Sequence, residues 1–198
     1  MRLREWTVDD AAWYAEATKD AEVQRYTADP PTLTAEQVAT AIDARRDHPS
    51  ATSFCIEDAG ERCGNVAVDV EDGIGHVSYL VAAPARGRGL ATKALTEFVA
   101  WIFAHHEVTE LRLWAHRDNT GSRKVAERAG FVRDPARDAD REIKGSTWPT
   151  VDRPSSDRRM RSPPDRNSQR DPSSPTAWQG SMCPGMCRSI GSLHGPSI

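Results

Sequence analysis

The sequence predicts an α/β (α+β) domain followed by a disordered tail. Three observations lead to this fold class. From residue 2 to about residue 133, segments of alternating apolar residues are interspersed with segments of helical periodicity, which indicates strands mixed with helices. The last 53 residues hold 8 of the 13 prolines and 11 serines and show neither period. No apolar run approaches the ~18 residues that cross a membrane. We therefore expect a domain over residues 1–145 and a low-complexity, disordered tail over residues 146–198.

The first part of the domain predicts one strand and two helices. Arg2–Trp6 has the character of a short strand, and Ala11–Thr18 that of a helix. Thr34 and Gln37 have the spacing of a capping box, which opens a second helix that ends near His48.

The middle of the domain predicts three strands and a long helix. The strands cover residues 52–57, 65–70 and 75–82, and Glu71-Asp72-Gly73 gives a hairpin signal between the last two. The helix follows because apolar residues then recur every four positions, at Leu90, Ala94, Phe98 and Ile102.

The end of the domain predicts a strand, a short helix and a further strand. Leu111–Ala115 alternates, Asp118 or Asn119 caps the helix, and Gly130 ends it as a left-handed cap. Phe131 begins the last strand. The predicted order is β-α-α-β-β-β-α-β-α-β.

Charge excludes several classes of protein. The 26 Lys and Arg against 29 Asp and Glu give a net charge of −3, of which the tail carries +3 and the domain −6. This balance argues against a protein that coats nucleic acid or an anionic membrane, and it suits a cationic ligand. The first ten residues are charged where a signal peptide needs an apolar core, so we expect a cytoplasmic protein.

The four cysteines predict neither a disulfide scaffold nor a metal site. Cys55 and Cys63 fall in predicted strands and are expected to be small buried residues. Cys183 and Cys187 have C-x-x-x-C spacing without a second His or Cys pair nearby, which does not fit a zinc site.

A glycine-rich turn between a strand and the long helix predicts an anion-binding site. Free N–H groups at a helix start bind phosphate, and Gly87 and Gly89 allow it to approach the backbone closely. Arg86 and Arg88 add positive charge. Thr92 stands where a Walker A loop or a dinucleotide fingerprint needs glycine. The alternative is a basic turn that only caps the helix.

A second polar segment opens the short helix after the next strand. Asn119 and Ser122 stand three residues apart there. By themselves they are explained as a helix cap.

Together, in this order, the two segments resemble the GNAT family of acetyl-CoA-dependent N-acetyltransferases. Residues 86–91 match the family's Arg/Gln-x-x-Gly-x-Gly/Ala motif, and Asn119 to Phe131, with Ser122 and Glu-Arg-Ala-Gly-Phe, resembles its second motif. Residues 20–26 and the helix capped at Thr34 are similar to the RimJ/RimL-like branch. The resemblance covers about residues 2–145 and implies a GNAT-like mixed, mainly antiparallel sheet flanked by helices.

The resemblance implies direct transfer of an acetyl group from the co-substrate acetyl-CoA to a primary amine, on a protein N-terminus or a small molecule. It implies no metal, and it is compatible with a monomer or a dimer. The pyrophosphate would lie on the backbone amides of Arg86, Gly87, Arg88, Gly89, Leu90 and Ala91.

The same resemblance gives roles to residues of the neighbouring elements. Leu80 and Val81 would align the pantetheine arm, and a backbone N–H of that strand would hold the oxyanion. Asn119 would hydrogen-bond the pantetheine, and Ser122 would protonate the departing thiolate.

The attacking amine must lose a proton, and His76 stands where relatives frequently carry Glu. A histidine with a pKa near ~6.5 can accept that proton at neutral pH. The alternatives are that His76 is a partly exposed strand residue, or that Glu57 or Asp69 on neighbouring strands is the base. Cys55 is not expected to act as a nucleophile, because the family mechanism has no acyl-enzyme.

The chain departs from the family after Phe131. Residues 141–145 resemble the next element, but the apolar alternation then ends, and Pro149 and Pro154 are not expected inside a central strand. We therefore expect the final strand to be missing or remade, as after a shifted reading frame. Two other functions stay open: a non-catalytic acyl-CoA-binding module with a degenerate C-terminus, and a binding protein that uses the basic tail at residues 158–161.

Overall fold

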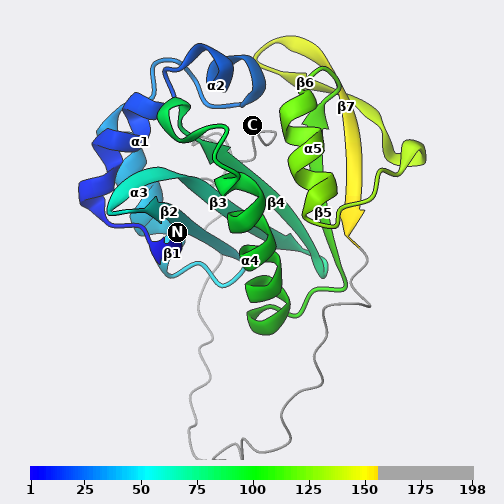
Figure 1. Cartoon of the computed structure of the whole chain (residues 1–198), viewed down its shortest axis with the longest axis horizontal. Helices are drawn as coiled ribbons and strands as arrows, with labels where there is room; N and C mark the ends of the chain where they lie inside the picture. Colours follow the sequence, from blue (N-terminus) through cyan, green and yellow to red (C-terminus); the bar gives the residue numbers. More distant parts are fainter. Residues whose placement is uncertain (156–198) are drawn as a thin grey trace, which may run out of the picture.

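A seven-stranded sheet organises residues 1–155, the part of the 198-residue chain that the computed structural model describes (Figure 1). The strands lie in the order β1-β2-β3-β4-β5-β7-β6, and each neighbouring pair is antiparallel except β4 and β5, which are parallel. The structure confirms the predicted mixed, mainly antiparallel sheet flanked by helices.

Most elements follow the predicted order. The strands are β1 (Arg2–Glu5), β2 (Ala51–Asp58), β3 (Glu61–Glu71), β4 (Ile74–Val81), β5 (Glu110–His116), β6 (Ala139–Ile143) and β7 (Ser146–Ser155). The α-helices are α1 (Ala11–Ala17), α2 (Ala21–Tyr26), α3 (Ala35–Arg46), α4 (Leu90–His105) and α5 (Thr120–Arg128). Short 3-10 helices are η1 (Val8–Asp10), η2 (Ala83–Ala85) and η3 (Pro135–Arg137).

The predicted capping box opens α3. The Thr34 hydroxyl accepts a hydrogen bond from the Gln37 backbone N–H at 3.3 Å, and the Gln37 side chain accepts one from the Thr34 N–H at 2.9 Å. The backbone N–H groups of Thr34 and Gln37, which have no partner within the helix, thereby gain hydrogen bonds.

The two faces of the sheet carry separate apolar clusters. Side chains alternate along each strand, so Val66 and Tyr79 face α4 and α5, where the apolar stripe of α4 is buried with Phe98 at its centre. Cys55 faces the other side, where α1 and α3 pack. None of the helices within residues 1–155 has the length and apolar character that crossing a membrane requires.

The parallel pair β4–β5 is short. Only residues 74–76 of β4 pair with residues 110–112 of β5, after which the two strands separate. The long helix α4 makes the connection between them, as a parallel crossover requires. The part of β4 that follows His76 therefore has β3 as its only strand neighbour in the described sheet.

Of the two alternatives for the final strand, missing or remade, the first is wrong, because β7 forms between β5 and β6. The expectation that proline is excluded from a central strand is also wrong, since β7 contains both prolines. The Pro149 carbonyl accepts from the Arg117 N–H at 2.8 Å, one position past the end of β5. Arg123 donates a side-chain bond to the Arg117 carbonyl at 3.1 Å, in place of the N–H that proline lacks. The Pro154 backbone faces away from β5, since its carbonyl accepts from Val132 N–H at 3.1 Å. Neither proline therefore interrupts the ladder with β5.

This last strand is also unlike an apolar core strand. It buries Asp152 and Arg153, and within the described residues Asp152 Oδ1 and Arg153 Nε have no hydrogen-bond partner. The sheet thus continues for ten residues past Gly145. Residues 156–198, including Cys183 and Cys187, lie outside the described residues.

Two further sequence-based expectations are wrong. Phe131 does not begin a strand, because its N–H bonds back to the Ala126 carbonyl of α5 at 3.0 Å and completes the helix end. The segment before α3 contains a second helix, α2, that the predicted order omits. Asp20 starts it by accepting a hydrogen bond from the Val23 N–H.

Candidate active site

A cavity of about 420 Å³ lies where the end of β4, the start of α4 and the start of α5 converge. It brings together seven of the predicted coenzyme residues, although the two motifs are about thirty positions apart in the sequence: Val81, Arg86, Gly87, Gly89, Leu90, Ala91 and Asn119. The other predicted residues, Leu80, Arg88, Ser122 and His76, are not among its lining residues.

The turn before α4 has the geometry that an anion site needs. Gly87 and Gly89 adopt φ of 74° and 75°, a left-handed conformation that residues with a side chain rarely adopt. Gly89 is the N-cap, and the first backbone bond of the helix runs from the Lys93 N–H to the Gly89 carbonyl. The preceding N–H groups of α4 therefore have no partner within the helix. A Cβ at Gly87 or Gly89 would meet no atom within 4 Å, so the space over the turn is open.

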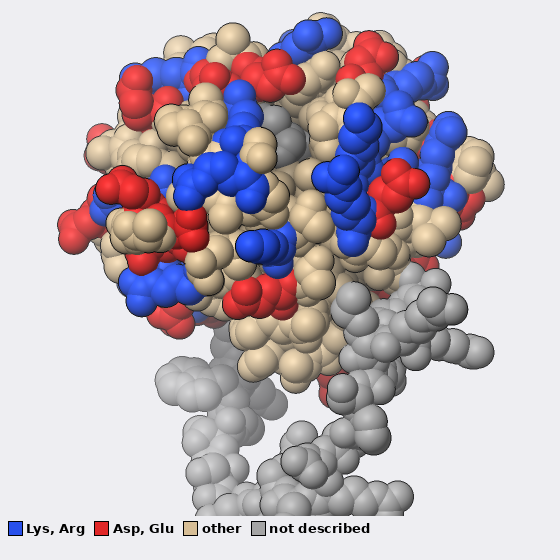
Figure 2. Space-filling model, in the orientation of Figure 1, with Lys and Arg blue, Asp and Glu red and all other residues tan. Residues whose placement is uncertain are grey.

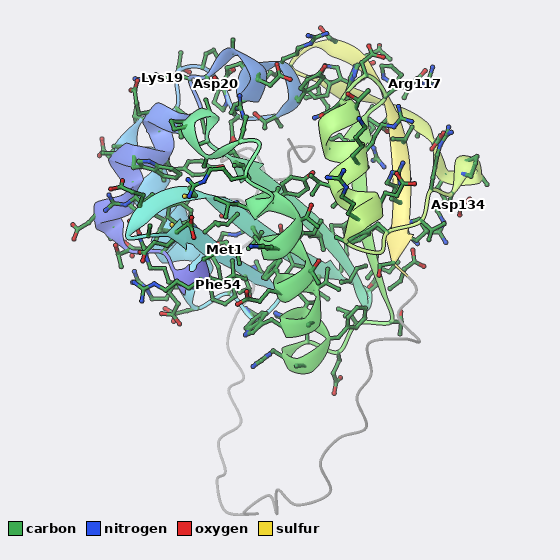
Figure 3. All side chains as sticks on the ribbon, in the orientation of Figure 1. Met1, Lys19, Asp20, Phe54, Arg117 and Asp134 are labelled. Carbon is green, nitrogen blue, oxygen red and sulfur yellow. The ribbon has the colours of Figure 1, made fainter. Side chains whose placement is uncertain are left out.

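The two arginines of the turn are engaged with carboxylates. Arg86 donates to Asp20 at 2.5 Å, and Arg88 pairs with Asp58. Figure 3 labels Asp20 beside α2. Both guanidinium groups are therefore partly neutralised, which the sequence did not predict.

A third arginine lines the cavity from α5. Arg128 lies on the same face of α5 as Gly121 and Val125, opposite the glycine turn. Figure 2 shows basic side chains over α5 and also over the start of α4, on either side of this region. An anion at the glycine turn would therefore have Arg86 on one side and Arg128 on the other, while Glu22 and Asp118 add negative charge elsewhere in the lining.

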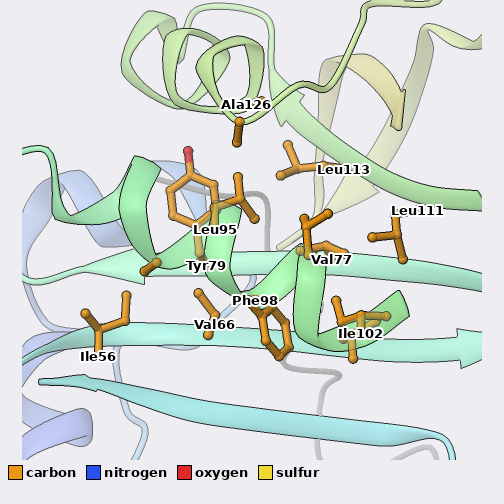
Figure 4. Close-up of a cluster of buried hydrophobic side chains, with 14 of the residues drawn as sticks. Ile56, Val66, Val77, Tyr79, Leu95, Phe98, Ile102, Leu111, Leu113 and Ala126 are labelled. Atoms are coloured by element: carbon orange, nitrogen blue, oxygen red, sulfur yellow. The ribbon is translucent and has the colours of Figure 1, made fainter. Parts of the chain in front are cut away.

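Tyr79 connects β4 to the start of α5. Its hydroxyl donates to the Ser122 Oγ at 3.0 Å, and Figure 4 shows this oxygen pointing away from the sheet toward α5. Burial raises the pKa of Tyr79 far above its usual value, so the hydroxyl stays a donor. Ser122 is itself fully buried, and its N–H donates to the Asn119 side chain at 2.9 Å. The Ser122 hydroxyl therefore holds α5 on the sheet, and its predicted contact with a thiolate stays a prediction.

The backbone of β4 presents Val81, and not Leu80, to the cavity. The Ala82 N–H donates to the Cys63 carbonyl of β3 at 2.9 Å. Because backbone groups alternate in direction along a strand, those of Leu80 also face β3, while those of Tyr79 and Val81 face the side where β5 has separated. The Val81 carbonyl accepts from Arg86 Nε at 3.1 Å.

His76 lies at the point where β4 and β5 separate. It is half-buried and is paired in register with Asp69 on β3 and Arg112 on β5. Its neighbours Val77 and Tyr79 point toward α4, so alternation places His76 on the opposite face of the sheet. It is therefore separated from the glycine turn by the sheet itself.

The alternative residues have different surroundings. Asp69 lies opposite His76 and accepts from Arg45 at 2.6 Å. Glu57 lies on β2 and accepts from Arg2 and Arg4 at the far side of the sheet. Cys55 is fully buried, and burial raises the pKa of its thiol to about 12. A thiol with that pKa is a poor nucleophile at neutral pH.

Comparison with known protein families decides the assignment. A model of the GNAT acetyltransferase domain matches residues 1–132. The chain belongs to the GNAT acetyltransferase family. This membership confirms the family predicted from the two motifs and identifies the protein as an acetyltransferase. No curated protein sequence matches the chain.

Solved structures of GNAT enzymes share this fold. RimJ of Mycobacterium smegmatis, in complex with CoA-disulfide, is 20% identical with a TM-score of 0.67, covering 78% of this chain and 81% of that one. A spermidine N-acetyltransferase chimera from Vibrio cholerae and hSSAT is 15% identical with a TM-score of 0.65, covering 78% and 95%. The aminoglycoside acetyltransferase AAC(6')-Ib, with coenzyme A and kanamycin, is 22% identical with a TM-score of 0.59, covering 76% and 92%.

The GNAT cavity also contains residues to which the sequence analysis gave no role in the site. Glu22 and Tyr26 of α2, Asp118 and Arg128 line it. Tyr26 is buried, and its ring centroid lies 5.6 Å from that of His116 at the end of β5. The i, i+4 spacing of Glu22 and Tyr26 could have indicated a helix face, but only the tertiary fold brings that face to the cavity.

Within residues 1–155, no group of three or more His, Cys, Asp or Glu side chains is arranged to hold a metal ion. The polar lining residues of the cavity contribute backbone N–H groups, an amide, two carboxylates, two guanidinium groups and the hydroxyl-bearing residues Tyr26, Thr92 and Thr120. This set is suited to hydrogen bonds and to charge pairing with an anion.

Proposed function

We propose that this GNAT domain transfers the acetyl group of acetyl-CoA to a cationic primary amine, on a protein N-terminus or a small molecule. The observation that carries the proposal is the cavity in which the glycine turn of α4 meets Val81 of β4 and Asn119 of α5. These three elements supply an anion site, a polar hydrogen-bonding site and a strand backbone along one continuous surface.

The residues present fit the coenzyme. The amides of residues 86–91 would hold its pyrophosphate, with Arg128 as a further cation, and Asn119 and the Val81 backbone would align its pantetheine arm. Acetyl-CoA, when bound, supplies an acetyl thioester to this site. A backbone N–H of β4 on the side facing the separated β5 would hold the oxyanion that forms at the carbonyl.

His76 would accept the proton of the attacking amine, either directly or through water. Its place at the separation of β4 and β5 supports this role, since an amine that enters from the cavity would meet His76 through the opening between these strands. Asp69, opposite His76, is the alternative base. Ser122 would act on the thiolate either directly or by positioning Tyr79, whose hydroxyl donates a hydrogen bond to the Ser122 Oγ.

A cationic acceptor is supported by charge. The domain over residues 1–145 carries −6, and Glu22 and Asp118 add carboxylates at the cavity. One structural neighbour is named for spermidine, a second is an aminoglycoside acetyltransferase in complex with kanamycin, and a third is RimJ. These ligands belong to the neighbours and define the acceptors to be tried first.

The test is a calorimetric titration with acetyl-CoA, followed by a thiol-release assay on spermidine, kanamycin and peptides with free N-termini. We expect micromolar binding of acetyl-CoA and release of CoA with at least one acceptor class. Binding without release for every amine tried would instead support the non-catalytic acyl-CoA-binding module. A folded protein that does not bind acetyl-CoA would contradict both functions.

Replacing the proposed base is expected to lower turnover and leave coenzyme binding intact. In His76→Gln, kcat should fall by about 100-fold or more, which is the usual contribution of a general base. The Kd for acetyl-CoA should stay within about twofold, because His76 does not line the cavity. His105→Gln, at the end of α4, is the matched control. An unchanged kcat in His76→Gln, with a large fall in Asp69→Asn, would transfer the role to Asp69.

Removing the cation on α5 is expected to weaken coenzyme binding. Arg128→Ala should raise the Kd for acetyl-CoA about tenfold, which is the size of a charge-assisted contact to phosphate. Lys124→Ala removes a charge from the same helix but not from the cavity lining, and it should change the Kd by less than about twofold. If calorimetry showed equal effects of the two substitutions on the Kd, the overall charge of α5 would attract the coenzyme, and Arg128 would make no direct contact with it.

A further inference from the structure

The helix α2 forms one wall of the cavity, and it is too short to be stable without contacts to the rest of the fold. It has six residues, of which Glu22 and Tyr26 line the cavity. An isolated helix of this length is not stable in water, because nucleation is costly and few hydrogen bonds repay it. The place of α2 is therefore set by its contacts with the rest of the fold.

One contact connects its start to the glycine turn. A single oxygen, Asp20 Oδ1, accepts from the Val23 N–H at 3.1 Å and from Arg86 Nη2 at 2.5 Å. Arg86 in turn donates from Nε to the Val81 carbonyl at 3.1 Å. The chain of contacts from α2 to the end of β4 thus runs through two side chains, and Arg86, Val81 and α2 all line the cavity.

Gln24 Nε2 donates to the Thr18 carbonyl after α1 at 2.7 Å, and further contacts connect α2 to the opposite side of the separated strands. Tyr26 lies against His116 at the end of β5, and Lys144, in the turn between β6 and β7, donates to the Gln24 carbonyl at 3.1 Å. Figure 1 shows α2 between α1 and the β6–β7 side, above the region where β4 and β5 diverge. The helix therefore spans both sides of the candidate active site.

We propose that Asp20 is a positioning residue that fixes α2 to Arg86, and thereby couples the coenzyme turn to the acceptor side of the cavity. The proposal rests on the proposed function. Binding of the coenzyme phosphates acts on the turn that contains Arg86, and an amine acceptor contacts the wall that contains Glu22 and Tyr26. Since the ion pair connects the two, each ligand should improve the binding of the other, and by the same factor.

Charge supports this role. Burial would raise the pKa of Asp20, but the hydrogen bond and charge of Arg86, together with the backbone hydrogen bonds from Val23 and Glu22, outweigh it and the pKa is lowered. The carboxylate is therefore ionised at neutral pH and forms a true ion pair with Arg86. Figure 3 shows Asp20 at the surface next to α2, where it can be replaced without disturbing the apolar core.

Three variants distinguish the helix cap that Asp20 forms at the start of α2 from its ion pair with Arg86. Asp20→Asn keeps an oxygen for the Val23 N–H, since Asn caps helices as well as Asp does, but loses the charge that holds Arg86. Asp20→Ala loses both interactions. Arg86→Gln removes the partner. Asp58→Asn is the matched control, because Asp58 pairs with the other arginine of the turn and belongs to β2, which contributes nothing to the cavity.

The experiment combines hydrogen exchange of the α2 amides with steady-state kinetics on the full chain, with acetyl-CoA and the acceptor found active. The reporters are the amides of Gln24 and Thr27, which bond to the Asp20 and Val23 carbonyls. We expect Asp20→Asn and Arg86→Gln each to speed their exchange about fivefold, and the double variant to add little, because both remove one ion pair. Asp58→Asn should leave the exchange unchanged.

In the kinetics, Asp20→Asn should raise the acceptor KM about fivefold and change the Kd for acetyl-CoA by less than about twofold in the absence of acceptor. Unchanged α2 exchange and unchanged acceptor KM in a variant that binds acetyl-CoA would overturn the inference. If the wild-type chain bound no acetyl-CoA while Asp20→Asn still sped α2 exchange, the proposed function and the coupling would fail and the positioning of α2 by Asp20 would stand.

Discussion

Gly89→Glu is expected to abolish acetyl-CoA binding, with a loss of at least about 100-fold in affinity. Gly89 is the N-cap of α4 with φ of 75°, and its neighbours' N–H groups face the open space of the cavity. A glutamate there places a negative charge among the groups that would bind phosphate, where like charges repel strongly. The strain of a side chain in this backbone conformation adds roughly 1–2 kcal/mol.

Gly89→Ala is the matched control, since it has the same backbone strain without the charge. Its Cβ would meet no atom within 4 Å, so it blocks nothing by contact. It should lower the melting temperature slightly and keep most of the affinity in calorimetry. If Gly89→Glu melted like Gly89→Ala and still bound acetyl-CoA normally, the glycine turn could not be the phosphate site.

Asp10→Ala is expected to cause the largest loss of stability, about 3–5 kcal/mol in the free energy of unfolding, the range for a broken buried ion pair. Asp10 is fully buried and accepts from Arg4 at 2.7 and 2.9 Å, from Arg62 at 2.5 Å and from the Thr7 N–H at 2.9 Å. Its removal leaves the partly buried guanidinium group of Arg4 and the more exposed one of Arg62 without their shared partner. Urea unfolding at pH 7 measures the effect. Asp9→Ala, at an exposed neighbouring position, should change stability by less than about 0.5 kcal/mol.

The contribution of Asp10 should depend on pH in a defined direction. Burial by itself would raise the pKa of Asp10, but the hydrogen bonds from Arg4, Thr7 and Arg62 outweigh it and hold the pKa well below its usual range. A lowered pKa gives stability that is complete above the unfolded value of about 4 and is lost as the pH falls below it. The difference between wild type and Asp10→Asn should therefore shrink from pH 5 toward about pH 3. A difference that stayed constant would mean that Asp10 acts by packing alone.

The parts of the site that the sequence predicts well are those encoded by neighbouring residues. The turn at Gly87 and Gly89, the α4 stripe and the Asn119 cap each depend on local geometry, and all are observed. The family could be identified for the same reason, because its two motifs are local signatures.

The features of the site and of β7 that the sequence did not predict depend on contacts between residues far apart in the chain. Arg86 and Arg88 are paired with acids 66 and 30 positions away, so their charge is not simply available to a phosphate. The direction of the Ser122 hydroxyl depends on Tyr79, from another element. The prolines of β7 fit because of contacts with Arg123 and with the end of β5. These contacts cannot be predicted from the residues of β7 alone.

The short pairing of β4 with β5 leaves an edge strand inside the sheet. Unpaired edges on the outside of a protein invite association with other chains, and folds cover or charge them. Here residues of α2, α4 and α5 line the cavity beside this edge. A narrow chain that carries amide groups, such as pantetheine, could form hydrogen bonds with this edge in the manner of an added strand. The opening at the proposed coenzyme site is therefore flanked by helices, which hinder pairing of this edge with a second copy of the chain.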